Sequence, residues 1–157
     1  MTILFRILVL VLVATLVPTV SPAADKKSGC RLTADAKPDK NDIAKIDFRA
    51  IDAKGRPRGG DSFGLDTKLV MIQTEWPHLT EPHNQVTQVH APDGNLFRTY
   101  TTAFDPTRPN KPDVELVFPV SGSWVQQMHL TGTWCVVVYL DNHPEPVAER
   151  GFVINLK

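Results

Sequence analysis

The segment from Glu75 to His83 holds the densest group of metal-capable side chains in the sequence, which reads Glu-Trp-Pro-His-Leu-Thr-Glu-Pro-His. His78, Glu81 and His83 offer two imidazoles and one carboxylate, which would leave the fourth position of a zinc or copper site open. Their spacing matches no established metal-binding signature. The sequence therefore offers two interpretations of this segment: a metal site made by these three residues, or a solvated, proline-stiffened loop.

Two further features bear on binding. Met128 and His129 would add a soft ligand pair for cuprous copper, although an alternating strand would place Met128 in the core and His129 in solvent. Trp76, if exposed beside His78, would form a contact patch for a protein or carbohydrate, because tryptophan is enriched at binding hot spots. The large area that a tryptophan gains by burial favours the core for Trp76, and also for Trp124 and Trp134.

No residue is assigned a catalytic role. The serines beyond the first 23 residues lie outside the Gly-x-Ser-x-Gly and Ser-x-x-Lys motifs. A phosphate-binding glycine loop and a complete calcium loop are also missing, so no cofactor is expected. Because a catalytic triad is a spatial arrangement, a small secreted hydrolase remains an alternative.

Residues 1–23 have the architecture of a secretory signal peptide. Arg6 is followed by an apolar run from Ile7 to Val17, then by Pro18 and by small residues that end at Ala23. An uncleaved anchor would need about 20 apolar residues, and only eleven separate Arg6 from Pro18. The sequence thus predicts cleavage near Ala23, no stable membrane span afterwards, and a periplasmic or secreted protein of a bacterial envelope.

Cys30 and Cys135 are the two cysteines of the chain. In an exported protein we expect them to form a disulfide, because oxidising compartments leave few thiols free. The bond would fix a polar N-terminal strap, residues 24–42, to a strand that contains Cys135. The small residues before Cys30 also resemble a lipidation site, but the charged residues 25–27 stand where a lipobox would have an aliphatic residue.

The charge balance argues against nucleic acid as a partner. The chain has 17 basic and 17 acidic residues, and the basic ones are not clustered. Binding to nucleic acid or to an acidic membrane surface would favour a concentrated basic excess.

The remaining chain, residues 43–157, predicts one domain built of short strands. Residues 43–52 fit either a strand or a helical face, and the position of Phe48 favours the strand. A glycine-rich loop is expected over 55–64. About seven short strands with frequent turns are typical of a sandwich, and we place them at 43–52, 69–76, 86–91, 96–104, 114–118, 134–140 and 147–156, with a further strand or extended piece at 125–130.

The last part of the chain, residues 132–156, resembles the final hairpin of exported bacterial immunoglobulin-like modules. The motif is Gly-Thr-Trp-x-Val-x-Val-Tyr-Leu-Asp, followed by a turn and Gly-Phe-Val-Ile. The resemblance implies an all-β, antiparallel immunoglobulin-like or fibronectin-like sandwich, with a small β-barrel as the alternative. Residue 133 is threonine, where antibody-type domains have the tyrosine of the tyrosine corner.

Such sandwiches carry many unrelated functions. The sequence favours a non-enzymatic exported module that binds a protein partner or an envelope component through its loops or an exposed sheet edge. The alternatives are a periplasmic zinc- or copper-binding protein that uses His78, Glu81 and His83, and the small hydrolase named above.

Overall fold

Alternating burial along the first strand settles the ambiguity of residues 43–52. The computed structural model describes residues 43–106 and 112–156. Strand β1 covers Lys45–Ile51, with Ile46, Phe48 and Ala50 buried and the residues between them more exposed. This period of two is that of a strand with one face on a core, so the strand interpretation is confirmed.

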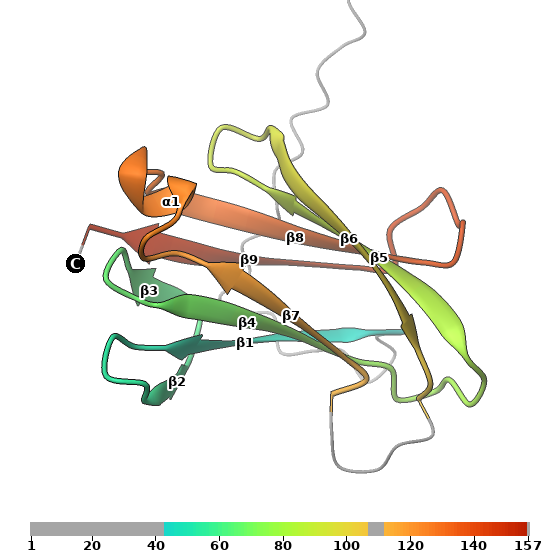
Figure 1. Ribbon diagram of the computed structural model, residues 1–157. Helices are drawn as coiled ribbons and strands as arrows, with labels where there is room; N and C mark the ends of the chain where they lie inside the picture. Colours follow the sequence, from blue (N-terminus) through green and yellow to red (C-terminus); the bar gives the residue numbers. More distant parts are fainter. Residues whose placement is uncertain (1–42, 107–111, 157) are drawn as a thin grey trace, which may run out of the picture.

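Two sheets face each other across one core (Figure 1). The first has four strands in the order β2-β1-β4-β7, and the second has five in the order β3-β9-β8-β5-β6. The sheets do not close into a barrel, so the predicted sandwich is confirmed over the barrel. The other strands are β2 Pro57–Gly59, β3 Ser62–Gly64, β4 Leu69–Glu75, β5 His83–His90, β6 Leu96–Phe104, β7 Val114–Pro119, β8 Gly132–Leu140 and β9 Ala148–Asn155.

Aromatic rings from both sheets form the centre of the core. Phe118 of β7 lies 5.0 Å from Trp134 of β8 and 5.8 Å from Phe152 of β9, measured between ring centroids. Phe48 of β1 lies 5.1 Å from Phe152. Edge-to-face and tilted contacts of this kind add to the apolar area that the rings bury. These contacts join the two sheets.

The segment 125–130 was predicted to be extended, and this prediction is wrong. Helix α1 covers Trp124–Gln127, and its N-cap Ser123 accepts a hydrogen bond from the backbone N–H of Val125 through Oγ, at 3.1 Å. A serine that follows a glycine turn is a strong helix-starting signal. Only Val125 of the helix is buried. Trp124 is 66% exposed and Met128 57% exposed, so the core positions predicted for both side chains are also wrong.

The expected loop over 55–64 contains two short strands. β2 pairs with β1 in antiparallel fashion, and β3 pairs in parallel with β9. Phe63 explains the second pairing, because its ring is buried 6.2 Å from that of Phe152. The sandwich therefore departs from a purely antiparallel arrangement at this point.

The predicted signal peptide, the strap 24–42 and Cys30 lie outside the described residues. Cys135 belongs to β8, as expected, and β8 is the middle strand of its sheet. Within the described ranges 43–106 and 112–156, no helix has the length and apolar character needed to span a membrane.

Candidate functional site

The three predicted metal ligands lie in different local environments. His78 and Glu81 are exposed between β4 and β5, whereas His83 is the first residue of β5 and is partly buried. The Nδ1 atom of His83 lies 3.0 Å from Oδ2 of Asp141. Among residues 43–106 and 112–156, no three His, Cys, Asp or Glu side chains are grouped to hold a metal ion. The structure therefore does not bring His78, Glu81 and His83 together.

Asp141 connects the start of β5 to the end of β8. Its Oδ1 accepts a hydrogen bond from the backbone N–H of Asn84 at 3.0 Å, and its Oδ2 contacts His83. The Asn84 hydrogen bond, followed by the His83 contact, lowers the pKa of Asp141 below its ordinary value of 3.8. The contact with Asp141 therefore gives His83 a structural role, which is to hold the start of β5 against the end of β8.

Trp76 is a core residue and not part of an exposed patch. Its side chain is 2% exposed and stacks on Phe104 with a centroid distance of 5.4 Å. Its Nε1–H donates to Oε1 of the buried Gln85 at 2.9 Å. The Nε2 group of Gln85 then donates to Oγ1 of Thr74 and of Thr87. The contact patch formed by Trp76 and His78 is thus excluded, and burial of Trp76 is confirmed.

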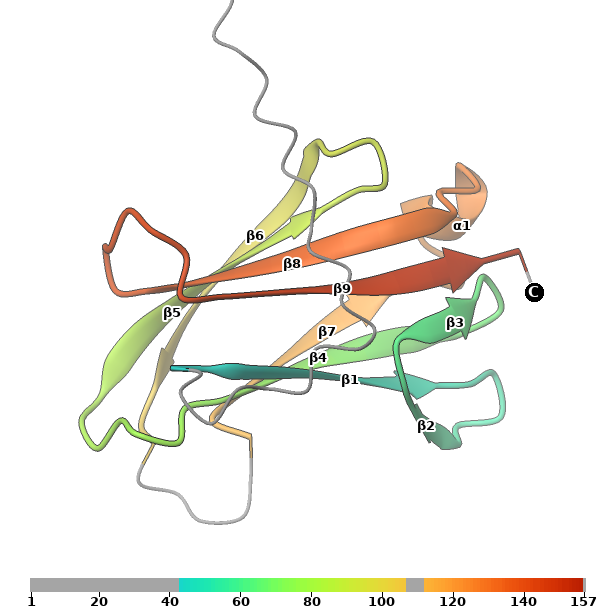
Figure 2. The same ribbon diagram turned by 180° about the vertical axis from the view of Figure 1, so that it is seen from behind.

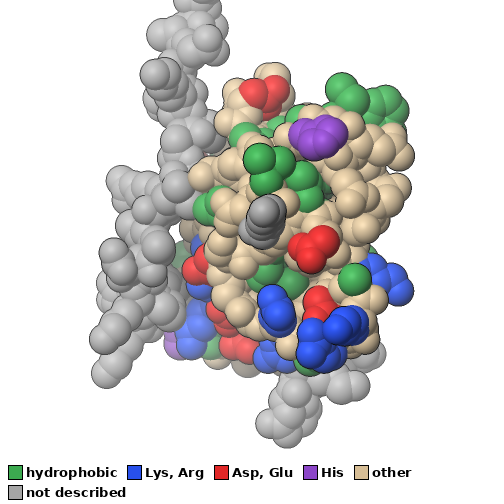
Figure 3. All heavy atoms as spheres, turned by 90° about the vertical axis from the view of Figure 1, so that its left-hand side faces the viewer, with side chains coloured by type: hydrophobic (Ala, Val, Ile, Leu, Met, Phe, Trp, Pro, Cys, Tyr) green, Lys and Arg blue, Asp and Glu red, His purple; other side chains and the backbone are tan. Residues whose placement is uncertain are grey.

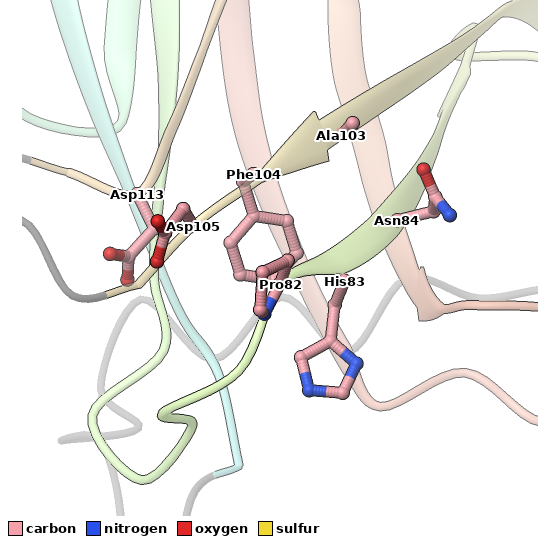
Figure 4. A pocket seen from close by; sticks show the side chains of 7 residues that line it. All are labelled: Pro82, His83, Asn84, Ala103, Phe104, Asp105 and Asp113. Atoms are coloured by element: carbon pink, nitrogen blue, oxygen red, sulfur yellow. The ribbon is translucent and has the colours of Figure 1, made fainter.

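A cavity of about 440 Å³ lies at the end of β6 (Figure 4). Its side chains come from the start of β5, from the end of β6, and from two aspartates, Asp105 and Asp113, that follow β6 and precede β7. Oδ2 of Asp113 accepts the backbone N–H of Trp76 at 2.6 Å. One carboxylate of the cavity therefore has a structural role in holding the end of β4.

A second cavity, of about 350 Å³, lies beside β2 and β3, and Lys54, Arg56 and Arg58 are among its residues. Figure 3 shows Lys and Arg side chains next to Asp and Glu side chains on this end of the molecule. Asp52 accepts hydrogen bonds from Arg56, whose guanidinium lies 2.9 Å away. Hydrogen bonds from the Arg56 backbone first, and from its side chain, lower the pKa of Asp52. This carboxylate already has its partner in the turn.

The feature best suited to binding is the free side of β6, which we call the open edge. β6 is the last strand of the five-stranded sheet and has nine residues, of which only Arg98 is charged. Leu96 is 53% exposed and Phe97 is 38% exposed at its start. Most other residues of the strand are exposed as well. Proteins normally protect such an edge with charges, prolines or short length.

The other three sheet edges have this protection. β2 and β3 have three residues each. β7 has six residues, contains Glu115 and ends at Pro119. One backbone group of β7 is also occupied, because the carbonyl oxygen of Val117 accepts a hydrogen bond from the hydroxyl of Tyr100 of β6 at 3.3 Å. Among the described strands, β6 is thus the one long edge without these devices.

Sequence reasoning anticipated an exposed sheet edge in general terms but did not identify β6. A signal was present, because the segment Leu96–Phe104 contains four threonine or tyrosine residues and a single charge. Whether such a segment lies at an edge depends on pairing with distant strands. The sequence alone does not show that pairing.

The two unclosed sheets with a shared aromatic core define the class of this protein as an all-β sandwich. Solved structures match it, among them an immunoglobulin-like protein from Pseudomonas aeruginosa that is 14% identical, with 71% of this chain and 92% of that chain covered and a TM-score of 0.37. No family model and no curated protein matches the chain. The assignment of the fold class rests on the sheets themselves.

Proposed function

We propose that this chain is an exported, non-enzymatic β-sandwich module, closed by a Cys30–Cys135 disulfide, that binds a protein partner or an envelope component. We further propose that the open edge is the binding surface and that it takes an extended segment of the partner as an added strand. The observation that carries this proposal is the exposed nine-residue strand β6, which has one charge and ends its sheet.

Strand addition suits the chemistry of this edge. An edge strand presents backbone N–H and C=O groups on its free side, and these groups bind an extended peptide through main-chain hydrogen bonds. Nine residues span about 30 Å at roughly 3.4 Å per residue, which is long enough for several such bonds. Leu96 and Phe97 offer apolar contacts at one end of the edge, and the cavity near Phe104 offers room for a side chain at the other end.

The metal-binding alternative has less support from the described geometry. His83 contacts Asp141, while His78 and Glu81 are exposed. The hydrolase alternative has no specific observation in its favour. Both are therefore ranked below edge binding.

Site-specific photo-crosslinking tests the proposal. A photoreactive residue is placed at Thr101, which is exposed in the middle of β6, or at Thr80, which is exposed in the loop before β5. Each full-length protein is expressed in its native host and irradiated. We expect an envelope protein to crosslink from position 101 and not from position 80.

A pair of charge variants provides the second arm. Thr99→Lys with Thr101→Lys places two cations on the edge, and lysine on an edge opposes strand pairing. Thr80→Lys is the matched control outside the edge. We expect the double variant to fold normally and to lose the crosslinked partner, while Thr80→Lys retains it. Equal crosslinking from both positions, or a partner retained by the folded double variant, would contradict the proposal.

A further inference from the structure

Two side chains on the outer face of β8 are buried although they point away from the core. Trp134, Val136 and Val138 belong to the core between the sheets. Cys135 and Val137 alternate with them on the opposite face, lie outside that core cluster, and are each only 5% exposed. An outer face of a two-layer sandwich normally meets solvent, so the burial of this pair needs an explanation.

The neighbouring strands flank this pair within the sheet but do not form a layer over it. β5 and β9 flank β8 within the same sheet and place Gln88 and Glu149 beside Val137. Val86 and Val153, on the same outer face of those strands, remain partly exposed. In Figure 2, no labelled helix or strand lies in front of β8 and β9. The described elements thus leave this face without a second layer.

The sulfur atom of Cys135 identifies a covering segment. The chain has two cysteines, and the described part contains no free cysteine. Cys135 also has an interaction partner beyond its 3.4 Å contact with Glu149. Within this chain, Cys30 is the remaining cysteine, and it belongs to the segment that precedes β1.

The start of β1 lies beside β9 at the margin of the five-stranded sheet, on the side that faces the core. Arg150 of β9 donates a hydrogen bond to the carbonyl oxygen of Ile46 and contacts Asp47 at 2.7 Å. In the register of the sheet, Arg150 pairs with Val136, and Gly151 pairs with Cys135. β3 pairs only with Val153–Asn155. No described strand therefore covers the outer side of β9 at Arg150, where the chain that leads into β1 can pass.

The preceding segment is long enough for this path. The thirteen residues from Cys30 to Asp42 span up to about 43 Å when extended, at roughly 3.3 Å per residue. The path from the start of β1 crosses a sheet separation of about 10 Å and one or two strand spacings of about 4.8 Å each. The available length exceeds this requirement.

We propose that residues 24–42 pack on the outer face of the five-stranded sheet, over Val137, and are held there by a Cys30–Cys135 disulfide. This inference rests on the disulfide of the proposed function but not on binding at the open edge. The bond forms by thiol–disulfide exchange. The two thiols lose two protons and two electrons, and a disulfide-bonded oxidant of the exporting compartment is reduced to two thiols.

Limited trypsin digestion of the oxidised mature chain tests the packing. The readout is cleavage after Arg31 and Lys40, both of which lie in the segment. We expect Val137→Asp to speed cleavage at Arg31 at least tenfold, because a carboxylate on this face expels the segment. Val117→Asp makes the same change on the outer face of β7, where the side chain is 50% exposed, and should leave the rate unchanged.

Two further measurements keep the outcomes distinct. Val137→Thr, a milder variant, serves if Val137→Asp fails to fold, and circular dichroism checks folding in each case. Peptide mapping without reductant should find Cys30 linked to Cys135. Rapid cleavage at Arg31 in the folded wild type would overturn the packing, and two free thiols would overturn the bond. The double variant Thr99→Lys, Thr101→Lys should keep the wild-type cleavage rate, so failure of edge binding is detected separately.

Discussion

Gln85 is a fully buried amide whose hydrogen bonds to three side chains link β4 and the residue after it to β5. It accepts from the indole N–H and donates to the hydroxyls of Thr74 and Thr87. Each polar group of the side chain is satisfied, as buried polar groups require. The network therefore fixes the indole of Trp76 against the start of β5 without leaving an unpaired group.

We expect Gln85→Leu to lower the free energy of unfolding by about 1–3 kcal/mol, because it leaves the buried indole N–H of Trp76 without an acceptor. Urea denaturation followed by tryptophan fluorescence measures the change. Gln127→Leu, at an exposed position of α1, is the control and should change stability by less than about 0.5 kcal/mol. Equal effects of the two variants would show that the network does not stabilise the fold.

Asp141 makes stability depend on pH in the acid range. The pKa of Asp141 in the folded state lies below the ordinary value of 3.8. Its contribution to the free energy of unfolding is therefore fully present above the ordinary pKa, and it is lost as the pH falls through the lower, folded-state pKa. We expect Asp141→Asn to show a flatter loss of Tm than the wild type between neutral pH and about pH 2. Glu81→Gln, in the exposed loop, should follow the wild-type profile. A wild-type slope in Asp141→Asn would contradict this assignment.

Individual residues also show the limit of sequence reasoning. His83 was a candidate ligand because it lies five positions from His78, whereas its contact in the structure is Asp141, 58 residues away. Burial of Trp76 was predicted from its size, but its partner Gln85 was not. Burial was readable from the sequence for Trp76 but not for Trp124 or Met128, which are exposed. Pairings between distant strands were not readable at all.

At the scale of strands, the side chain of Arg150 links β9 of one sheet to β1 of the other. From β9 it contacts Asp47 of β1 and both oxygens of Asp61, and its guanidinium lies over the ring of Phe48 at 5.4 Å. We expect Arg150→Met to keep the packing of the stem and lower the free energy of unfolding by about 1–2 kcal/mol, since hydrogen bonds to charged groups count more than neutral ones.

Chemical denaturation in low and high salt measures this effect. Arg98→Met, on the exposed strand β6, is the matched control and should have little effect. The difference between wild type and Arg150→Met should shrink at high salt, because the group is partly exposed and its charges are screened. A loss of the same size in low and high salt would contradict the assignment of this stabilisation to the charged group of Arg150.

The elements themselves were predicted with uneven success. β4, the β5–β6 hairpin, β7, β8 and β9 follow from apolar runs, alternation and turn residues, and their ends fall within a few positions of the expected ones. α1 was missed because four residues give no helical period, although the cap at Ser123 was a signal. β2 and β3 were missed because three-residue strands form through their partners, β1 and β9.

For the molecule as a whole, the fold class was predictable and the site was not. Frequent turns and apolar alternation suffice to indicate a sandwich. The strand order, which makes β6 an edge and β8 a central strand, results from tertiary pairing. The proposed binding surface is the side of β6 on which no described strand is paired. It can therefore be identified only from the assembled sheets.

The two long margins of the sandwich are held together to different degrees. On one margin Arg150 links β9 to β1 through two hydrogen bonds, and on the other the described residues link β6 to β7 through one hydrogen bond, from the Tyr100 hydroxyl, and one ring contact, between Phe97 and Phe118. Local opening starts where fewest buried contacts must break. Backbone amides of β6 should thus exchange with solvent deuterium well before those of β8 and β9, and the sheets should separate first along the margin that contains the open edge.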